Sequence, residues 1–226
     1  LIEVAADPKN TASPVDLGRY YYYLGHVCIQ DNDEKAATSS FRRALDLAPG
    51  YPPAAIALAR RHAQRGSLPQ AEALLSNAAR IALEQGKTSD ALRLRRHLAD
   101  LQASAGNRAG ALAELRAVVG TGDCSVDDRL ALAELYAADD SSRERAVDEL
   151  RAVVEAQPDH LAALRRMAEL FPSGDATARL RPLRALRILG QATKKELAAL
   201  GKAEKAATQP RGVLTDELRA HHLNVE

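Results

Sequence analysis

Small and apolar residues recur along the chain at helical spacing. Ala37, Phe41 and Ala44 follow one another at intervals of four and three residues, which places them on one face of an α-helix. A similar run lies upstream and consists of Tyr21, Leu24, Gly25 and Cys28. The two runs predict a helical hairpin that turns near Asn32, with Pro49 ending its second helix.

The pattern returns three more times. One small residue marks the same position in each block: Ala37, Ala71, Ala111 and Ala146. The steps between them are 34, 40 and 35 residues. The longer step predicts about one and a half additional helical turns near residues 81–89, where Gly86 breaks the run.

Residues 18–51 resemble a tetratricopeptide repeat, whose pattern is W-x2-L-G-x2-Y…A-x3-F-x2-A-x4-P. The pattern is carried here by Tyr21, Leu24, Gly25, Cys28, Ala37, Phe41, Ala44 and Pro49. Weaker copies cover residues 52–85, 92–125 and 127–160. The resemblance implies an all-α fold, a right-handed α-α superhelix of about four to five helical hairpins with a helical cap at its C-terminal end.

This fold class implies a division of the chain into three parts. We expect residues 1–14 to be the tail of an upstream repeat or a linker, with a disordered arm as the alternative. Residues 15–171 are expected to form the solenoid, with a fifth hairpin beginning at Leu161. Residues 172–226 are expected to form a C-terminal helical cap, because the end of a solenoid needs an outer face that tolerates water. The alternative is a separate short recognition element.

The C-terminal part carries its own helix signals. Asp175 is expected to cap a helix that runs to about residue 189 and that Pro182 kinks. Thr193 and Glu196 have the spacing of a capping box, which predicts a helix over residues 194–207. A last short helix is expected after Thr215.

Composition supports a helical protein and excludes several classes. Hydrophobic residues make up 46% and aromatic residues 4%, without tryptophan, which argues against an all-β domain. Two cysteines, Cys28 and Cys124, do not make a disulfide framework and suit a reducing compartment. No apolar run is long enough for a membrane helix, and no signal peptide is recognisable. We therefore expect a cytoplasmic protein, with the periplasm left open, and the composition suggests a GC-rich bacterium.

No catalytic signature is present. The sequence contains no G-x-S-x-G, no H-E-x-x-H, no glycine-rich phosphate loop and no C-x-x-C motif. Its six histidines show no tight spacing with a second metal ligand on one helix face. We expect neither enzymatic activity nor a metal or cofactor.

The candidate site is a surface. The resemblance implies that the first helix of each hairpin lines a concave groove, which we expect to be aromatic at its mouth, basic in the middle and acidic near Asp128. The partner-binding candidates are Arg19, Tyr22, His26, Gln30, Arg60, Gln64, Arg93 and Arg96. The arginines suit an acidic or phosphorylated segment, although their aliphatic stems could simply cover an alanine-rich surface. In the run from Tyr20 to Tyr23, we expect Tyr21 to fill the core and at least one or two of its neighbours to face solvent or another element.

The resemblance implies a non-enzymatic adaptor whose partner is another protein. That partner would offer an acidic or phosphorylated segment, or be a folded protein such as a small GTPase or a pilus, secretion or motility component. The alternative is a structural spacer within a larger multi-repeat protein, with a basic tail that contacts an acidic partner surface. Residues 161–226 carry 12 basic and 7 acidic residues. Aromatic residues do not alternate with these basic ones, which argues against nucleic acid.

Overall fold

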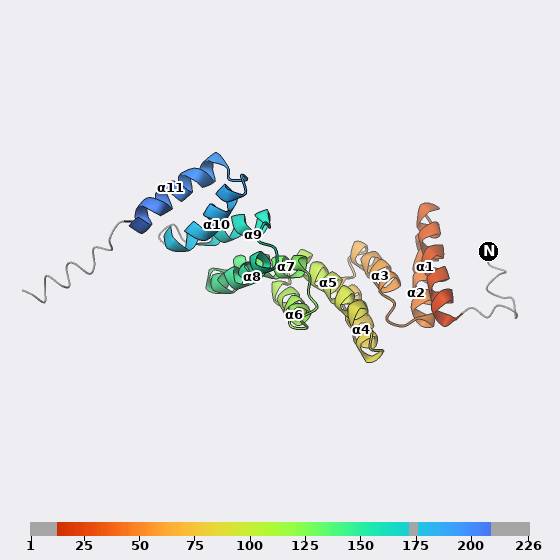
Figure 1. Cartoon of the computed structure of the whole chain (residues 1–226). Coiled ribbons are helices and arrows are strands. Elements are labelled where there is room, and N and C mark those ends of the chain that lie inside the picture. The colour runs from red at the N-terminus through yellow and green to blue at the C-terminus, as the bar shows by residue number, and fades with distance from the viewer. Residues whose placement is uncertain (1–12, 172–175, 209–226) are drawn as a thin grey trace, which may run out of the picture. The chain divides into compact units, whose positions relative to one another are not determined.

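The computed structural model describes residues 13–171 and 176–208 of the chain. Within these ranges the chain forms helices and no strand (Figure 1). The elements are α1 (Pro14–Gln30), α2 (Glu34–Leu47), α3 (Pro52–Gln64), α4 (Leu68–Glu84), α5 (Thr88–Ser104), α6 (Arg108–Val119), α7 (Val126–Ala137), the 3₁₀ helix η2 (Asp140–Ser142), α8 (Arg143–Ala156), α9 (Leu161–Leu170), α10 (Ala176–Ile188) and α11 (Lys194–Thr208). Residues 1–12 of the predicted N-terminal segment, the cap at Asp175 and the helix after Thr215 lie outside the described residues.

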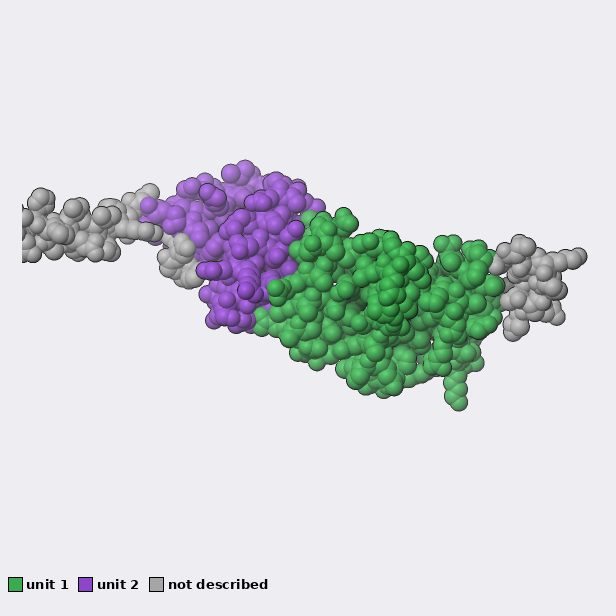
Figure 2. All heavy atoms as spheres, turned by 90° about the horizontal axis from the view of Figure 1, so that it is seen from below, with its two compact units in different colours: residues 1–128 green, residues 129–226 purple. Residues whose placement is uncertain are grey.

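The chain divides into two compact units, residues 1–128 and residues 129–226 (Figure 2). In the first unit, α1 pairs with α2, α3 with α4, and α5 with α6, and each hairpin packs on the next in chain order. The predicted anchors Ala37, Ala71 and Ala111 have no exposed surface. The predicted all-α stack of hairpins is therefore confirmed.

The two helices of the first hairpin approach each other most closely at a glycine. A β-carbon at Gly25 of α1 would lie 2.5 Å from the Phe41 ring of α2, so only glycine allows the two helices this approach. Phe41 has no exposed surface. Tyr21, which we expected to fill this core, is only half-buried, whereas Phe41 is fully buried in it.

The hairpin turns lie where the sequence puts them. Asn32 has φ 58° between α1 and α2, and Gly66 has φ 77° between α3 and α4. Both residue types tolerate this left-handed conformation. Asp33 then caps α2 by accepting a hydrogen bond from the Ala36 N–H at 2.9 Å.

The step from Ala71 to Ala111 is six residues longer than the step from Ala37 to Ala71. These six additional residues are spread over two helices. α4 has 17 residues where α2 has 14, and α5 has 17 where α3 has 13. The link between α4 and α5 is one residue shorter than the link between α2 and α3. Gly86 lies in that link with φ 72°, which confirms the predicted break.

The second unit continues the helical pattern. Arg129 of α7 lies 2.9 Å from Glu149 of α8, and Ala146 of α8 is fully buried. α9 begins at Leu161, as predicted, and packs on α8 and α10. Pro182 lies inside α10.

α11 begins at the predicted capping box. The Glu196 carboxylate accepts a hydrogen bond from the Thr193 N–H at 2.6 Å, and the Thr193 hydroxyl accepts one from the Glu196 N–H at 3.2 Å. These reciprocal bonds satisfy two donors that would otherwise be left free at the helix start.

Candidate functional site

An aromatic cluster joins the first two hairpins. The Tyr22 ring of α1 has its centroid 4.7 Å from that of His26 and 6.0 Å from that of Phe41. It also lies 5.9 Å from Tyr51, which directly precedes α3. Tyr23, the next residue of α1, is 65% exposed, which confirms that one member of the tyrosine run faces solvent.

The pKa of Tyr51 is affected by burial and by the charged groups around this cluster. Burial raises the pKa of Tyr51 above its ordinary value, and the neighbouring Tyr23 adds to the shift. The positive charges of Arg19 on α1 and Arg93 on α5 oppose it. Two predicted site arginines from different hairpins therefore act on the same phenol.

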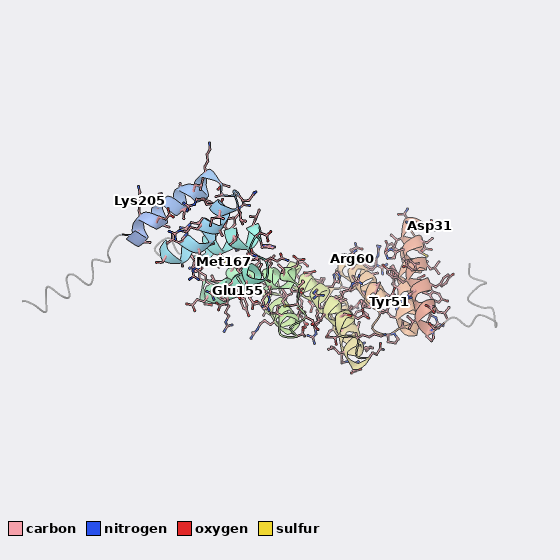
Figure 3. All side chains as sticks on the ribbon, viewed as in Figure 1. Asp31, Tyr51, Arg60, Glu155, Met167 and Lys205 are labelled. Carbon is pink, nitrogen blue, oxygen red and sulfur yellow. The ribbon has the colours of Figure 1, made fainter. Side chains whose placement is uncertain are left out.

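A cavity of about 200 Å³ lies between α3 and α5. Its lining combines apolar residues with a few polar ones: Ile56, Ala59, Arg60, Ala63, Leu75, His97, Asp100, Leu101 and Ser104. Among them is Arg60, one of the predicted partner-binding residues. Figure 3 labels Tyr51 at the start of α3 and Arg60 toward its end.

The charges of both Arg60 and Arg93 act on the pKa of His97, which lines this cavity. Burial lowers the pKa of His97 below its ordinary value. Asp100 opposes that shift, whereas the charges of Arg93 and Arg60 reinforce it. Two guanidinium groups, one from α3 and one from α5, thus lie near one half-buried imidazole.

Arg60 and Arg93 are exposed, and within the described part of the chain neither has a carboxylate within 4 Å. Neighbouring arginines on other faces of the same helices are paired. Arg61 lies 2.6 Å from Glu34, and Arg95 lies 2.8 Å from Glu114. The unpaired positive charge of α3 and α5 is therefore concentrated beside the cavity.

Arg96 differs from the other two candidates. Its Nε and Nη2 atoms donate to the two carboxylate oxygens of Asp128 at 2.6 and 2.7 Å. The Asp128 side chain is only 5% exposed and also accepts hydrogen bonds from the Ser125 N–H and hydroxyl. Asp128 is thus buried in an internal ion pair, and the expected exposed acidic end of the groove at this residue is wrong.

The Asp128 carboxyl has a lowered pKa. Burial alone would raise it, but the hydrogen bonds from Arg96 and Ser125 outweigh burial and hold the pKa below its ordinary value. The same pair raises the pKa of Arg96. Both groups stay charged, so the pair fixes α5 against the start of α7 rather than offering Arg96 as a free cation.

The remaining candidates surround the aromatic cluster and the ends of the helices. Arg19 lies 3.7 Å from Asp16 in an exposed pair. Gln30 and Gln64 are the last residues of α1 and α3, and both are exposed. Sequence reasoning missed Tyr51 and His97. His97 stands four residues after Arg93 and so shares its helix face, a spacing that could have identified it.

In the first unit, helical hairpins that pack on one another in chain order are the arrangement of helical repeat proteins. Residues 29–84 match the family model described as tetratricopeptide repeat, so this part of the chain is similar to that family. Proteins of this family are generally non-enzymatic scaffolds. A search of the curated proteins finds no match.

Solved structures share the fold at low sequence identity. Yeast Tom70 is 18% identical with a TM-score of 0.56, over 89% of this chain and 43% of that one. MamA from Desulfovibrio magneticus RS-1, residue 41 to its end, is 12% identical with a TM-score of 0.52, over 85% and 96%. A putative kinesin light chain of Podospora anserina with TPR-like repeats is 18% identical with a TM-score of 0.51, over 88% and 100%. These likenesses establish the fold alone.

Two further features bear on the type of site. Among the described residues, no helix is both long and apolar enough to cross a membrane. Across the same residues, no group of three or more histidine, cysteine, aspartate or glutamate side chains is arranged to hold a metal ion. The candidate site itself combines aromatic rings, a small cavity and unpaired arginines.

Proposed function

We propose that this chain is a non-enzymatic adaptor that binds an acidic or phosphorylated segment of a partner protein along α1, α3 and α5. The observation that carries the proposal is the pair Arg60 and Arg93. Both are exposed and free of carboxylates in the described structure, and both act on His97 beside the cavity. Guanidinium groups bind carboxylates and phosphates through paired hydrogen bonds.

The aromatic cluster supplies the second half of the binding surface. Tyr22 and Tyr51 offer ring faces and hydroxyl groups, and His26 packs against Tyr22. Tyrosine and arginine are enriched among the residues that dominate binding energies at protein interfaces. In the proposed complex, Arg19 lies at the aromatic end of the segment and Arg60 at the cavity end.

The cavity between α3 and α5 suits one apolar side chain of the bound segment. Ile56, Ala63 and Leu101 supply apolar surface, and His97 and Ser104 supply polar atoms at the edge. Because His97 has a lowered pKa, it is neutral near pH 7 and adds little charge to the site. The bound sequence would thus combine an aliphatic residue with nearby acidic or phosphorylated residues.

The glutamines at the helix ends complete the proposed site. Gln30 and Gln64 can each donate and accept hydrogen bonds with the backbone of an extended segment. Arg96 is assigned a positioning role only, because its hydrogen bonds to Asp128 occupy two of its nitrogen atoms.

Comparative capture from a native lysate tests the proposal. The baits are the wild-type chain, the double variant Arg60→Glu and Arg93→Glu, and the control Arg42→Glu and Arg43→Glu. The control residues are exposed on α2, and their change alters net charge equally. We expect proteins that the wild type and the control retain and the Arg60/Arg93 variant loses.

Identical sets of captured proteins from all three baits would contradict the adaptor proposal. That result would favour the spacer alternative, in which the repeats only separate other parts of a larger protein. A set lost equally with both variants would indicate attraction by net charge, which also contradicts a specific site on α3 and α5.

A further inference from the structure

The end of α10, the turn after it and the first part of α11 each carry an exposed large aliphatic side chain. Ile188 is 81% exposed, Leu197 is 43% exposed and Leu189 is 38% exposed. They lie outside the core of this hairpin, in which Leu183 and Leu200 are buried. Exposed aliphatic groups of this size contribute little to folding, and several of them close together in the chain suit a contact surface.

Backbone hydrogen bonds hold this turn in place. The Gly190 N–H donates to the Arg187 carbonyl at 3.0 Å, and the Gln191 N–H donates to the Leu186 carbonyl at 3.0 Å. Arg165 of α9 donates to the Gln191 carbonyl at 2.9 Å. The exposed side chains are therefore carried by a bonded turn that α9 supports, and not by a fraying helix end.

The same hairpin carries an excess of positive charge. α10 and α11 contain eight basic residues and two acidic ones. Both acidic side chains are paired inside the unit, in Arg165–Glu196 at 3.1 Å and Arg184–Glu204 at 3.2 Å. Lys194 and Lys195, at the start of α11, are exposed and have no carboxylate within 4 Å in the described structure. Two unpaired positive charges thus stand between Leu189 and Leu197 in the chain.

We propose that this tip, formed by Ile188, Leu189, Leu197, Lys194 and Lys195, docks on an anionic lipid bilayer. The aliphatic side chains enter the boundary between headgroups and acyl chains, and the lysines meet the lipid phosphates and carboxylates. A projecting turn fits a deformable lipid surface, whereas a protein partner would have to supply both a matching groove and matching acidic residues. The proposal does not depend on the groove of the first unit.

Vesicle co-sedimentation of the full chain tests this inference. The probes are vesicles of phosphatidylcholine mixed with phosphatidylserine and vesicles of phosphatidylcholine alone. We expect sedimentation with the anionic vesicles only, and weaker sedimentation as salt rises, because salt screens the attraction. Ile188→Ser with Leu189→Ser, and separately Lys194→Glu with Lys195→Glu, should each reduce the bound fraction at least about fivefold.

Matched controls separate the tip from general stickiness and charge. Leu83→Ser changes a 43%-exposed leucine of α4, and Arg42→Glu with Arg43→Glu repeats the charge change elsewhere, so both should bind vesicles like the wild type. Equal binding to both vesicle types, or binding unaffected by the tip variants, overturns the proposal. Two further results would overturn the proposal if the chain does not bind vesicles. One is a dimer in sedimentation equilibrium that is lost with Ile188→Ser and Leu189→Ser. The other is binding of an acidic protein ligand that is lost with the same variant.

Discussion

At the scale of single residues, the closest approach between helices occurs at Gly25. A methyl group there would meet the Phe41 ring, which has no exposed surface and cannot move aside. We expect Gly25→Ala to lower the free energy of unfolding by about 1–3 kcal/mol. Urea denaturation followed by circular dichroism measures the change.

Gly201→Ala is the matched control for this prediction. Gly201 lies inside α11, and a β-carbon there would meet no atom within 4 Å. Alanine favours the helix interior over glycine by about 1 kcal/mol, so this variant should be as stable as the wild type or more stable. Equal losses in both variants would contradict the packing assigned to Gly25.

The Arg96–Asp128 pair makes stability depend on pH. The pKa of Asp128 is lower in the folded chain than its ordinary value, so the contribution of the carboxylate is fully present above the unfolded pKa and is lost as pH falls through the folded pKa. We expect Asp128→Asn to cost about 2 kcal/mol near pH 7, less than for a fully buried pair because the Arg96 side chain is 33% exposed. The gap between the two proteins should narrow in acid.

Urea midpoints measured from neutral pH down to the acid range test this dependence. Asp148→Asn is the control, because Asp148 and Arg151 form an exposed pair that should contribute less than about 1 kcal/mol. A loss for Asp128→Asn that is as small as the control loss, or that stays constant down to the lowest pH, would contradict the internal ion pair.

At the scale of helices, the starts of α2 and α4 differ in their capping. Asp33 accepts a hydrogen bond from the Ala36 N–H, whereas Ser67 makes no side-chain hydrogen bond at the start of α4. We expect Asp33→Ala to destabilise the chain by about 1 kcal/mol and Ser67→Ala by less than about half of that. Thermal denaturation of the two variants compares them directly, and the reverse order would contradict the capping.

The helices were predictable because their signals are local. The spacing of Ala37 and Phe41, the turn at Asn32 and the capping box at Thr193 each involve residues only a few positions apart. The lengths of α4 and α5 were harder to predict from the sequence. Gly86 indicates where the helices are interrupted, but it does not indicate how the six additional residues are divided between them.

At the scale of the whole molecule, the all-helical fold and the packing of successive hairpins in the first unit follow from the repeat period. The pairing of polar side chains does not follow from the repeat period. Arg96 and Asp128 are 32 residues apart, and periodicity predicts the helix face on which each residue lies but not the residue with which it pairs. The same reason explains why Arg96 was grouped with Arg60 and Arg93. Three-dimensional contacts were needed to separate the internal arginine from the two exposed ones.

The central claim is that the unpaired arginines of α3 and α5 form a binding site for an acidic segment. The most direct test selects acidic peptides from a random library on the wild-type chain and measures their dissociation constants by fluorescence anisotropy. Arg60→Glu with Arg93→Glu should weaken binding at least about tenfold, and Arg42→Glu with Arg43→Glu should change it less than about twofold. Equal affinity of the Arg60/Arg93 variant and the wild type would contradict the claim.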